Sequence, residues 1–233
     1  MISLSELQER IQRVEQNIQR ACERSGRNRS DINVVAVTKA VSSTRSREVK
    51  DAGIIQHGEN RAEGLLHKRD MLTDGIVWHF IGNLQSRKVR DIINHVDYLH
   101  SLDRTSIAKE IQKRATDKIN CFVQVNVSGE DSKSGISPET LEDFLSTIAT
   151  LDKIRIIGLM TMAPNTEDST LIRSVFRTLK QLRDRIKLQQ LPHAPCTELS
   201  MGMSNDYVIA IEEGATYVRI GTALVGVESE GEE

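Results

Sequence analysis

Short apolar runs alternate with helical patterns along most of this chain, and that alternation constrains its fold more than any other feature. We expect strands near residues 33–38, 54–57, 76–81, 96–100, 119–127, 154–160, 196–200 and 216–220. Apolar residues at helical spacing predict helices near 44–52, 60–71, 84–94, 104–115, 138–149, 168–189 and 204–213. Strands separated by helices run parallel and are covered by those helices, which is typical of α/β proteins.

Eight strands with helices between them predict a closed (β/α)8 barrel of the TIM type, and 233 residues suit a single domain of that kind. An open doubly wound sheet is the alternative, but no glycine-rich dinucleotide loop follows the first strand. We expect an N-terminal helix packed on the barrel over residues 1–30, the barrel over residues 31–226, and a disordered acidic tail over residues 227–233.

The N-terminal segment predicts an amphipathic helix with one apolar stripe. The stripe consists of Leu4, Leu7, Ile11, Val14, Ile18 and Ala21. Such a stripe packs either against its own domain or against a second copy, as a short coiled coil. We favour packing on the barrel, because three heptads are near the lower limit for a coiled coil. We therefore expect a monomer, with a weak dimer as the alternative.

The composition argues against several kinds of partner. A formal charge of -2 and an aromatic content of 3% provide neither the field nor the stacking surface that nucleic acid requires. Cys22, Cys121 and Cys196 lack metal-ligand spacing, so we expect no metal site and no disulfide framework. We see no secretory signal and no apolar stretch that could span a bilayer. The expectation is a cytoplasmic protein without a nucleic-acid or membrane partner.

Lys39 ends the first apolar run, residues 34–38, and is the most informative residue for function. The carboxyl ends of barrel strands are where these folds build their sites. A lysine held there in low dielectric would lose part of its proton affinity and could form an imine with an aldehyde. Most lysines at strand ends are solvated surface residues, so this segment alone leaves both interpretations open.

The ends of other strands bring further polar residues to the same rim. These residues lie at 57–60, 78–82, 131–135 and 160–162. The loop after the seventh strand, residues 200–206, and the end of the eighth, residues 218–222, are rich in glycine and hydroxyl groups. Barrels often bind phosphate at these two loops. We therefore expect a phosphate-bearing ligand beside Lys39.

Several of these segments carry a resemblance to a known family. The segments are Val35-Ala36-Val37-Thr38-Lys39, Gly58-Glu59-Asn60, His79-Phe80-Ile81-Gly82 with Leu84-Gln85 and Lys88, Lys133-Ser134-Gly135, Gly158-Leu159-Met160-Thr161-Met162, Leu199-Ser200-Met201-Gly202-Met203-Ser204 and Arg219-Ile220-Gly221. With these segments in this order, the chain resembles the pyridoxal phosphate homeostasis proteins, which are single-barrel relatives of the alanine racemase barrel. The resemblance runs from about residue 33 to Gly226.

This resemblance implies a ligand and a set of site residues. Pyridoxal 5'-phosphate, the active form of vitamin B6, would be the cofactor, held as a Schiff base (an internal aldimine) on Lys39. Arg219 would be the partner of the pyridine nitrogen, and Asn60 would lie near the ring. The phosphate would be held by Ser200, Ser204, Gly221 and Thr222, with a backbone role at best for Met201.

An arginine opposite the pyridine nitrogen favours a carrier over a strong catalyst. Arginine does not accept a proton from that nitrogen, so the ring is a weaker electron sink. Racemases that this barrel resembles add a tyrosine base from another domain, which we do not expect here. Tyr98, Tyr207 and Tyr217 fall within predicted strands or helices. We therefore expect a protein of pyridoxal phosphate homeostasis that releases the cofactor to other enzymes or amines, such as amino acids, without robust catalysis.

Two other functions and one other residue stay open. A pyridoxal-phosphate-dependent amino-acid racemase or lyase is the main alternative. A class I aldolase that uses Lys39 on a phosphosugar is a third interpretation, in which Arg219 has no obvious task. Lys133 lies on a rim loop and is a candidate for a transient second acceptor of the cofactor. The histidines lack metal spacing, and we interpret His57 and His79 as structural or rim residues.

Overall fold

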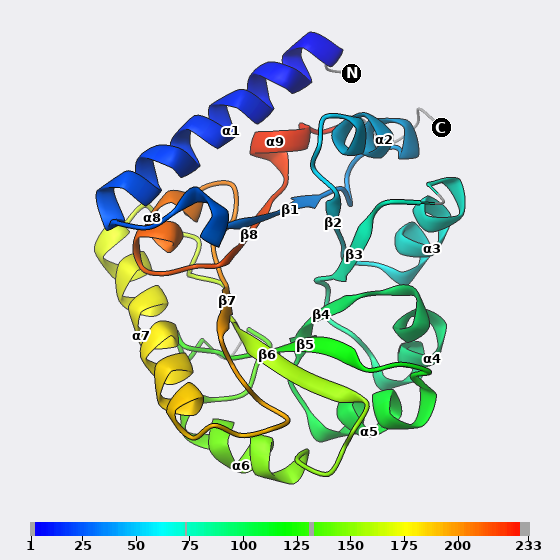
Figure 1. The fold of residues 1–233 in the computed structure, drawn as a ribbon, viewed down its shortest axis with the longest axis vertical. Coiled ribbons are helices and arrows are strands. Elements are labelled where there is room, and N and C mark those ends of the chain that lie inside the picture. Colours follow the sequence, from blue (N-terminus) through cyan, green and yellow to red (C-terminus); the bar gives the residue numbers. More distant parts are fainter. Residues whose placement is uncertain (1–2, 73, 131–132, 229–233) are drawn as a thin grey trace.

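The structure is a closed barrel of parallel strands surrounded by helices (Figure 1). It is a computed structural model that describes residues 3–72, 74–130 and 133–228. The strands are β1 Asn33–Val37, β2 Gln56–Glu59, β3 Val77–Phe80, β4 Tyr98–Leu102, β5 Ile119–Gln124, β6 Ile154–Met160, β7 Glu198–Ser200 and β8 Tyr217–Ile220. Each strand pairs with the next, and β8 pairs with β1. The predicted (β/α)8 barrel is confirmed, and the open sheet is wrong.

Helices on the outside of the barrel connect the strands (Figure 1). They are α2 Ser43–Asp51, α3 Ala62–Met71, α4 Val89–Ile92, α5 Thr105–Arg114, α6 Leu141–Thr147, α7 Ser169–Leu188 and α8 Tyr207–Glu212, with 3₁₀ turns η1 Arg29–Asp31, η2 Ser86–Lys88, η3 Ile93–His95 and η4 Pro138–Thr140. A short helix that the sequence analysis missed, α9 Thr222–Val225, follows β8. Its four residues are too few to show a helical period. No helix in the described part of the chain is long and apolar enough to cross a bilayer.

Several strand boundaries differ from the prediction, and those of the second and seventh strands differ for identifiable reasons. The second strand is Gln56–Glu59, later than predicted, because its polar side chains find buried partners. His57 Nε2 lies 2.9 Å from the Ile54 carbonyl, and Glu59 pairs with Lys68. The seventh strand begins at residue 198 and not at residue 196. Cys196 has a φ of 46°, which a strand does not accommodate.

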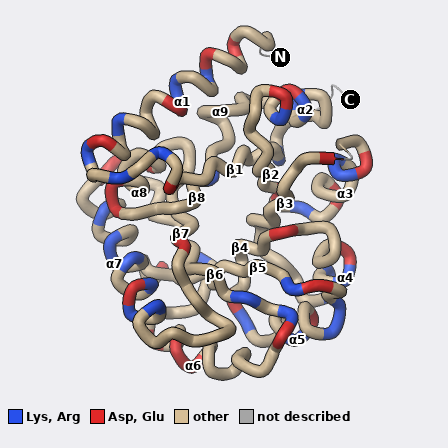
Figure 2. The backbone as a smooth tube through the Cα atoms, in the orientation of Figure 1, with Lys and Arg blue, Asp and Glu red and all other residues tan. Residues whose placement is uncertain are grey.

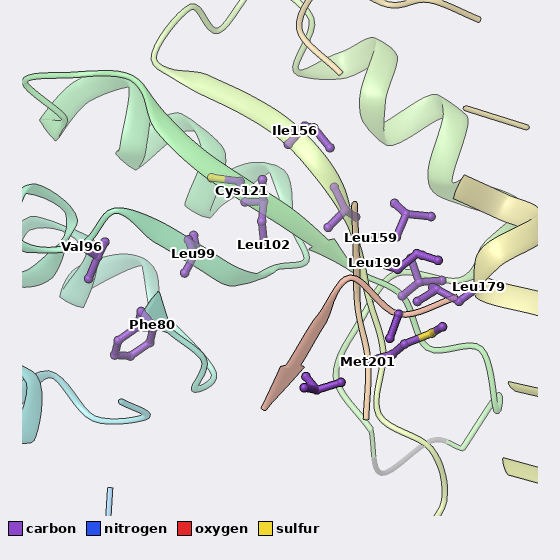
Figure 3. Packing of buried hydrophobic residues seen from close by; sticks show 14 of the residues in the cluster. Phe80, Val96, Leu99, Leu102, Cys121, Ile156, Leu159, Leu179, Leu199 and Met201 are labelled. Atoms are coloured by element: carbon purple, nitrogen blue, oxygen red, sulfur yellow. The ribbon is translucent and has the colours of Figure 1, made fainter. Parts of the chain in front are cut away.

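Apolar side chains form two layers, one on each face of the barrel wall. The outer layer fills the space between strands and helices; Figure 3 shows Leu99 and Leu199 from the strands and Leu179 from α7 among its members. The inner layer is a separate cluster of Val35, Phe122, Ile157, Met160 and Tyr217. The barrel interior is therefore packed with side chains, as this fold requires. Lys, Arg, Asp and Glu lie mainly on the surrounding helices and loops (Figure 2).

The N-terminal helix α1, Leu4–Ser25, packs against α8 and α9. The Ser3 hydroxyl accepts a hydrogen bond from the Glu6 N–H, and Gly26 ends the helix with a φ of 66°. Leu7 and Ile18 are fully buried. Much of the apolar stripe is therefore covered by the same chain, in agreement with the extra N-terminal helix predicted for the barrel.

The segment that follows α9 lies against the turn after β1. The Glu228 N–H donates to the Ala40 carbonyl at 3.2 Å, and the Glu228 carboxylate accepts from the Ser42 N–H at 2.5 Å. Residues 229–233 of the predicted disordered tail lie outside the described residues. The predicted division into three regions therefore stays a prediction.

Two leucines of α1 provide a matched test of its packing. Leu7 is 0% exposed and Leu4 is 53% exposed. We expect Leu7→Ala to lower the free energy of unfolding by about 2–4 kcal/mol, because it opens a cavity between α1 and the barrel. Leu4→Ala should change it by about 0.5 kcal/mol or less. Urea titrations of both variants measure the difference, and equal effects would contradict this packing.

Candidate functional site

Lys39 lies in the turn that directly follows β1. β1 pairs with β2 on one side and with β8 on the other, so the rim residues of both strands are its neighbours. The Lys39 side chain is exposed, in contrast to the low-dielectric position considered from the sequence. Among the described residues, no hydrogen bond or ion pair occupies its ammonium group. The amine is therefore accessible at the carboxyl end of the barrel.

A buried ion pair anchors the peptide that precedes Lys39. Lys68 Nζ on α3 lies 2.8 Å from Glu59 Oε1 and donates to the Thr38 carbonyl at 2.5 Å. The Thr38 hydroxyl donates to the same Glu59 oxygen at 2.6 Å. Thr38, Glu59 and Lys68 are all buried. Glu59 belongs to a rim segment predicted from the sequence, whereas Lys68 was not predicted, because lysine on a helix normally points to solvent.

The other end of the same turn is held by Ser42, Arg45 and Glu228. Ser42 caps α2, and its hydroxyl accepts from the Arg45 N–H at 3.2 Å. The Glu228 carboxylate binds the Ser42 N–H and lies 3.4 Å from Arg45 Nε. Burial tends to raise the pKa of Glu228, but these hydrogen bonds and Arg45 outweigh it and lower the pKa. Charged side chains thus fix the backbone on both sides of Lys39.

Arg219 is a buried cation on β8, the strand next to Lys39. Its register partner on β1 is Val35. Nη1 donates to Ser200 Oγ at 2.5 Å, and Nη2 donates to the Thr161 carbonyl at 3.1 Å. Burial lowers the pKa of Arg219 to about 10, with a smaller opposing effect of Asp206. The group stays charged at neutral pH, and no carboxylate of the described residues forms an ion pair with it.

Ser200 and Met201, two predicted ligands of the phosphate, lie in the barrel wall. Both are fully buried. The Ser200 hydroxyl contacts Arg219 and, at 2.8 Å, His100 Nδ1. The Met201 N–H donates to the Tyr217 carbonyl at 3.1 Å. In this structure the Ser200 hydroxyl therefore binds Arg219, and the Met201 N–H belongs to the hydrogen bonds of the barrel sheet.

The other predicted phosphate ligands come together where β8 ends. Ser204 Oγ accepts from the Gly221 N–H at 3.2 Å and from the Ala223 N–H at 3.3 Å. Thr222, between these two amides, is exposed. The structure thus brings together Ser204, Gly221 and Thr222, and adds the Ala223 amide, which no sequence pattern indicates. Two backbone amides and a hydroxyl that converge in this way can bind an oxyanion.

Asn60 follows β2 and is partly exposed at the rim. Its carbonyl packs against Gly82, where an added Cβ would lie only 2.0 Å from the Asn60 oxygen. Any side chain at position 82 would therefore displace Asn60. This close approach explains why glycine ends the third strand's rim segment.

Lys133 lies in the loop after β5, where its ammonium is already paired. Nζ lies 2.8 Å from the Glu130 carboxylate and 3.5 Å from Ser128 Oγ. Asp131 and Ser132, which the sequence analysis placed on the same rim, lie outside the described residues. Its role as a second acceptor stays a prediction.

His79 and His100 lie inside the barrel and not at its rim. His79 Nδ1 is 2.9 Å from His100 Nε2, and the His79 ring stacks on Tyr98 with centroids 4.5 Å apart. Burial lowers the pKa of His79 to about 3 and places that of His100 well below its usual value. In the described part of the chain, no group of three or more His, Cys, Asp or Glu residues could hold a metal ion. The structural interpretation of His79 stands, although its position is deeper than expected.

The three tyrosines lie away from the rim turn of Lys39. Tyr98 and Tyr217 belong to the packed barrel interior, with ring centroids 5.9 Å apart. Burial raises the pKa of Tyr217, with a further contribution from Tyr98. The Tyr207 hydroxyl on α8 accepts a hydrogen bond from Asn17 at 2.9 Å. None of the three is placed as a base beside the lysine.

Removing the buried ammonium group of Lys68, which binds the peptide before Lys39, should destabilise the protein. We expect Lys68→Met to lower the free energy of unfolding by about 3–5 kcal/mol, because Glu59 is left buried and unpaired. Lys133→Met, which breaks a more exposed pair, should cost about 1 kcal/mol or less. Urea titrations measure both. Combining Lys68→Met with Glu59→Gln should recover part of the loss, and an additive loss would contradict the ion pair.

The buried histidines predict a loss of stability on mild acidification. Burial lowers the pKa of His57 to about 4 and that of His79 to about 3, while an unfolded histidine titrates near about 6.5. Between these values the unfolded chain binds more protons, so the free energy of unfolding falls as the pH is lowered. We expect a fall between about pH 6.5 and about pH 5, of at most about 1.4 kcal/mol per unit for each histidine.

Denaturant titrations across this pH range measure the slope. In the His57→Phe variant the free energy of unfolding should depend less steeply on pH than in the wild type. The difference should correspond to the uptake of at most one proton on unfolding. Equal slopes for both proteins would show that His57 is not buried in its neutral form.

Comparisons with known proteins show which family this chain belongs to. The family model of the alanine racemase N-terminal domain matches residues 10–229. The pyridoxal phosphate homeostasis protein of Aquifex aeolicus (strain VF5) is 42% identical over 225 residues, covering 94% of this chain and 96% of that protein.

Two solved structures are similar along most of their length. A structure of an unknown protein from Bifidobacterium adolescentis has a TM-score of 0.90 at 34% identity and covers 96% of this chain and 97% of that chain. PipY of Synechococcus elongatus PCC7942, solved with PLP bound, has a TM-score of 0.79 at 30% identity and covers 90% of this chain and 100% of that chain. The resemblance seen in the sequence is confirmed: the chain belongs to the alanine racemase N-terminal domain family, within the group of pyridoxal phosphate homeostasis proteins.

Proposed function

We propose that this protein binds pyridoxal phosphate through Lys39 and serves in its homeostasis, releasing it to other enzymes or amines. One observation carries the proposal: a buried arginine without a described carboxylate partner lies on the strand next to an accessible lysine. A buried cation that lacks a counter-ion calls for an electron-rich ligand. The pyridine nitrogen of pyridoxal phosphate is such an acceptor.

The residues present fit the three functional groups of pyridoxal phosphate. The Lys39 amine is exposed and suits the aldehyde. Arg219 offers a fixed N–H donor for the ring nitrogen. The amides of Gly221 and Ala223, with Ser204, suit the phosphate. We therefore propose Ser204, Gly221, Thr222 and Ala223 as the phosphate site, with Ser200 acting through Arg219.

The chain's own residues supply positioning, and the bound cofactor would supply an aldehyde, which forms an imine with an amine with loss of water and is released from it with uptake of water. The Thr38–Glu59–Lys68 network fixes the backbone that carries the Lys39 amine. Arg219 donates to the ring nitrogen and does not give up its proton at neutral pH. Asn60, held by its contact with Gly82, lies at the same rim.

The same geometry favours a carrier over a racemase or lyase. A ring nitrogen that faces an arginine drains electrons weakly from a substrate carbon. The tyrosines lie in the barrel interior or on α8, so none supplies a second base beside Lys39. An exposed lysine also favours exchange with amines from solution, because water is not excluded.

We propose amines and apo-enzymes that need pyridoxal phosphate as the recipients. Burial of the α1 stripe on its own barrel supports a monomer. The three buried free thiols, Cys22, Cys121 and Cys196, suit a reducing cytoplasm.

Reduction with borohydride tests the role of Lys39. The wild-type protein, saturated with pyridoxal phosphate, should absorb visible light and give one reduced adduct that peptide mass mapping assigns to Lys39. Lys39→Ala should lose both the absorbance and the adduct, because no other amine at the site replaces it. Lys109→Ala, an exposed lysine on α5, should behave like the wild type. A Lys39→Ala protein with an unchanged spectrum would contradict the assignment.

The same samples separate the remaining alternatives. An adduct at Lys133 in the wild type would support its role as a second acceptor. Exchange of an amino acid's α-proton in heavy water, at a rate near ~10 s⁻¹, would favour a racemase or lyase over a carrier.

A further inference from the structure

A chain of hydrogen bonds inside the barrel leads away from Arg219. Arg219 Nη1 donates to Ser200 Oγ at 2.5 Å, Ser200 Oγ lies 2.8 Å from His100 Nδ1, and His100 Nε2 lies 2.9 Å from His79 Nδ1. The four side chains come from β8, β7, β4 and β3, and all are buried. The chain ends at His79 Nε2, which has no hydrogen-bond partner in the described structure.

Counting donors and acceptors favours one order of the protons in this chain of hydrogen bonds, because that order gives the Ser200 hydrogen an acceptor. Arginine only donates, so Ser200 Oγ must accept from it. The single Ser200 hydrogen then has His100 Nδ1 as its described acceptor. A neutral His100 that accepts at Nδ1 carries its proton on Nε2 and donates to His79 Nδ1. His79 in turn carries its proton on Nε2, so both rings have the same tautomer.

The surroundings keep both rings neutral. Burial lowers the pKa of both histidines, and Arg219 disfavours a second positive charge at His100. The rings around them belong to Tyr98, Phe122 and Tyr217. Asp206 is the acidic group that acts on Arg219, and it acts at a distance without an ion pair.

We propose that His100 and His79 are positioning residues that set the direction of Arg219 through Ser200. By accepting a hydrogen bond from the Ser200 hydroxyl at Nδ1, His100 turns a lone pair of the serine oxygen toward the guanidinium. Neutral acceptors thereby orient Arg219 without cancelling its charge, and the full cation faces the ring nitrogen of the ligand. This inference deepens the proposed function and rests on it for the identity of that ligand.

Nuclear magnetic resonance tests the proton order without any ligand. Long-range proton–nitrogen correlation spectra of the ¹⁵N-histidine-labelled protein near pH 7 distinguish the two tautomers and the cation. We expect His79 and His100 to be neutral with the proton on Nε2, their signals assigned from single-histidine variants. A proton on Nδ1 of His100, or a protonated ring, would overturn the proposal.

Binding measurements test the positioning. His100→Leu should raise the dissociation constant for pyridoxal phosphate about two- to tenfold and shift the absorption maximum of the bound form, because Arg219 loses its orientation. In His100→Asn the amide oxygen of the new side chain can accept from Ser200. This variant should therefore keep an affinity and an absorption maximum close to those of the wild type. His57→Phe replaces a buried histidine that does not belong to this chain of hydrogen bonds. It should change neither the dissociation constant nor the absorption maximum.

The outcomes separate this inference from the proposed function. Equal affinity and an unshifted spectrum in His100→Leu would overturn the positioning role. A wild-type protein that fails to bind pyridoxal phosphate would contradict the proposed function, while the tautomers of His79 and His100 would still decide the proton order.

Discussion

The pairing of β1 with β8 is the interaction on which the site depends. Closing the barrel places Val35 beside Arg219 in register. Arg219 therefore lies buried on the strand next to the one that leads to Lys39, although the two residues are far apart in sequence. The remaining site residues come from loops of the same two strands and their neighbours. Without closure the lysine would be an ordinary exposed side chain after a strand. The order of the strands in the closed barrel thus brings the site positions together, and the residues at those positions determine the chemistry.

Lys68 and Arg219, two of the buried cations among the described residues, have opposite kinds of partner. Lys68 is neutralised by Glu59 and serves only the backbone below Lys39. Arg219 receives only neutral acceptors, Ser200 and the Thr161 carbonyl. Desolvating an unpaired guanidinium opposes folding, so the protein gives up stability to keep that charge available. A ligand that accepts from Arg219 would return part of this free energy on binding.

The sequence was sufficient for the barrel and for the order of its strands, because apolar periodicity and chain order determine both, whereas the bounds of several strands differ by a few residues. Lys39 and the loops that contain Ser204 and Gly221 could be selected because the rim positions of strands one, seven and eight are readable from the pattern. The role expected for Arg219 came from the family resemblance alone. The contacts within the site could not be read in the same way. The direction of Ser200 depends on whether its strand faces inward, and Lys68 depends on how α3 rotates over β2. Both orientations depend on how distant segments pack together, and no local sequence pattern indicates them.

The bond between Glu228 and the α2 cap ties the end of the described chain to the turn that carries the lysine. Because β8 pairs with β1, the segment after β8 lies near the turn after β1, and Glu228 bonds to that turn. A fluorophore attached at residue 228 would therefore lie beside the turn that carries Lys39, the residue proposed to bind the cofactor. A probe on this carboxyl-terminal segment would therefore report the binding and release of pyridoxal phosphate in real time.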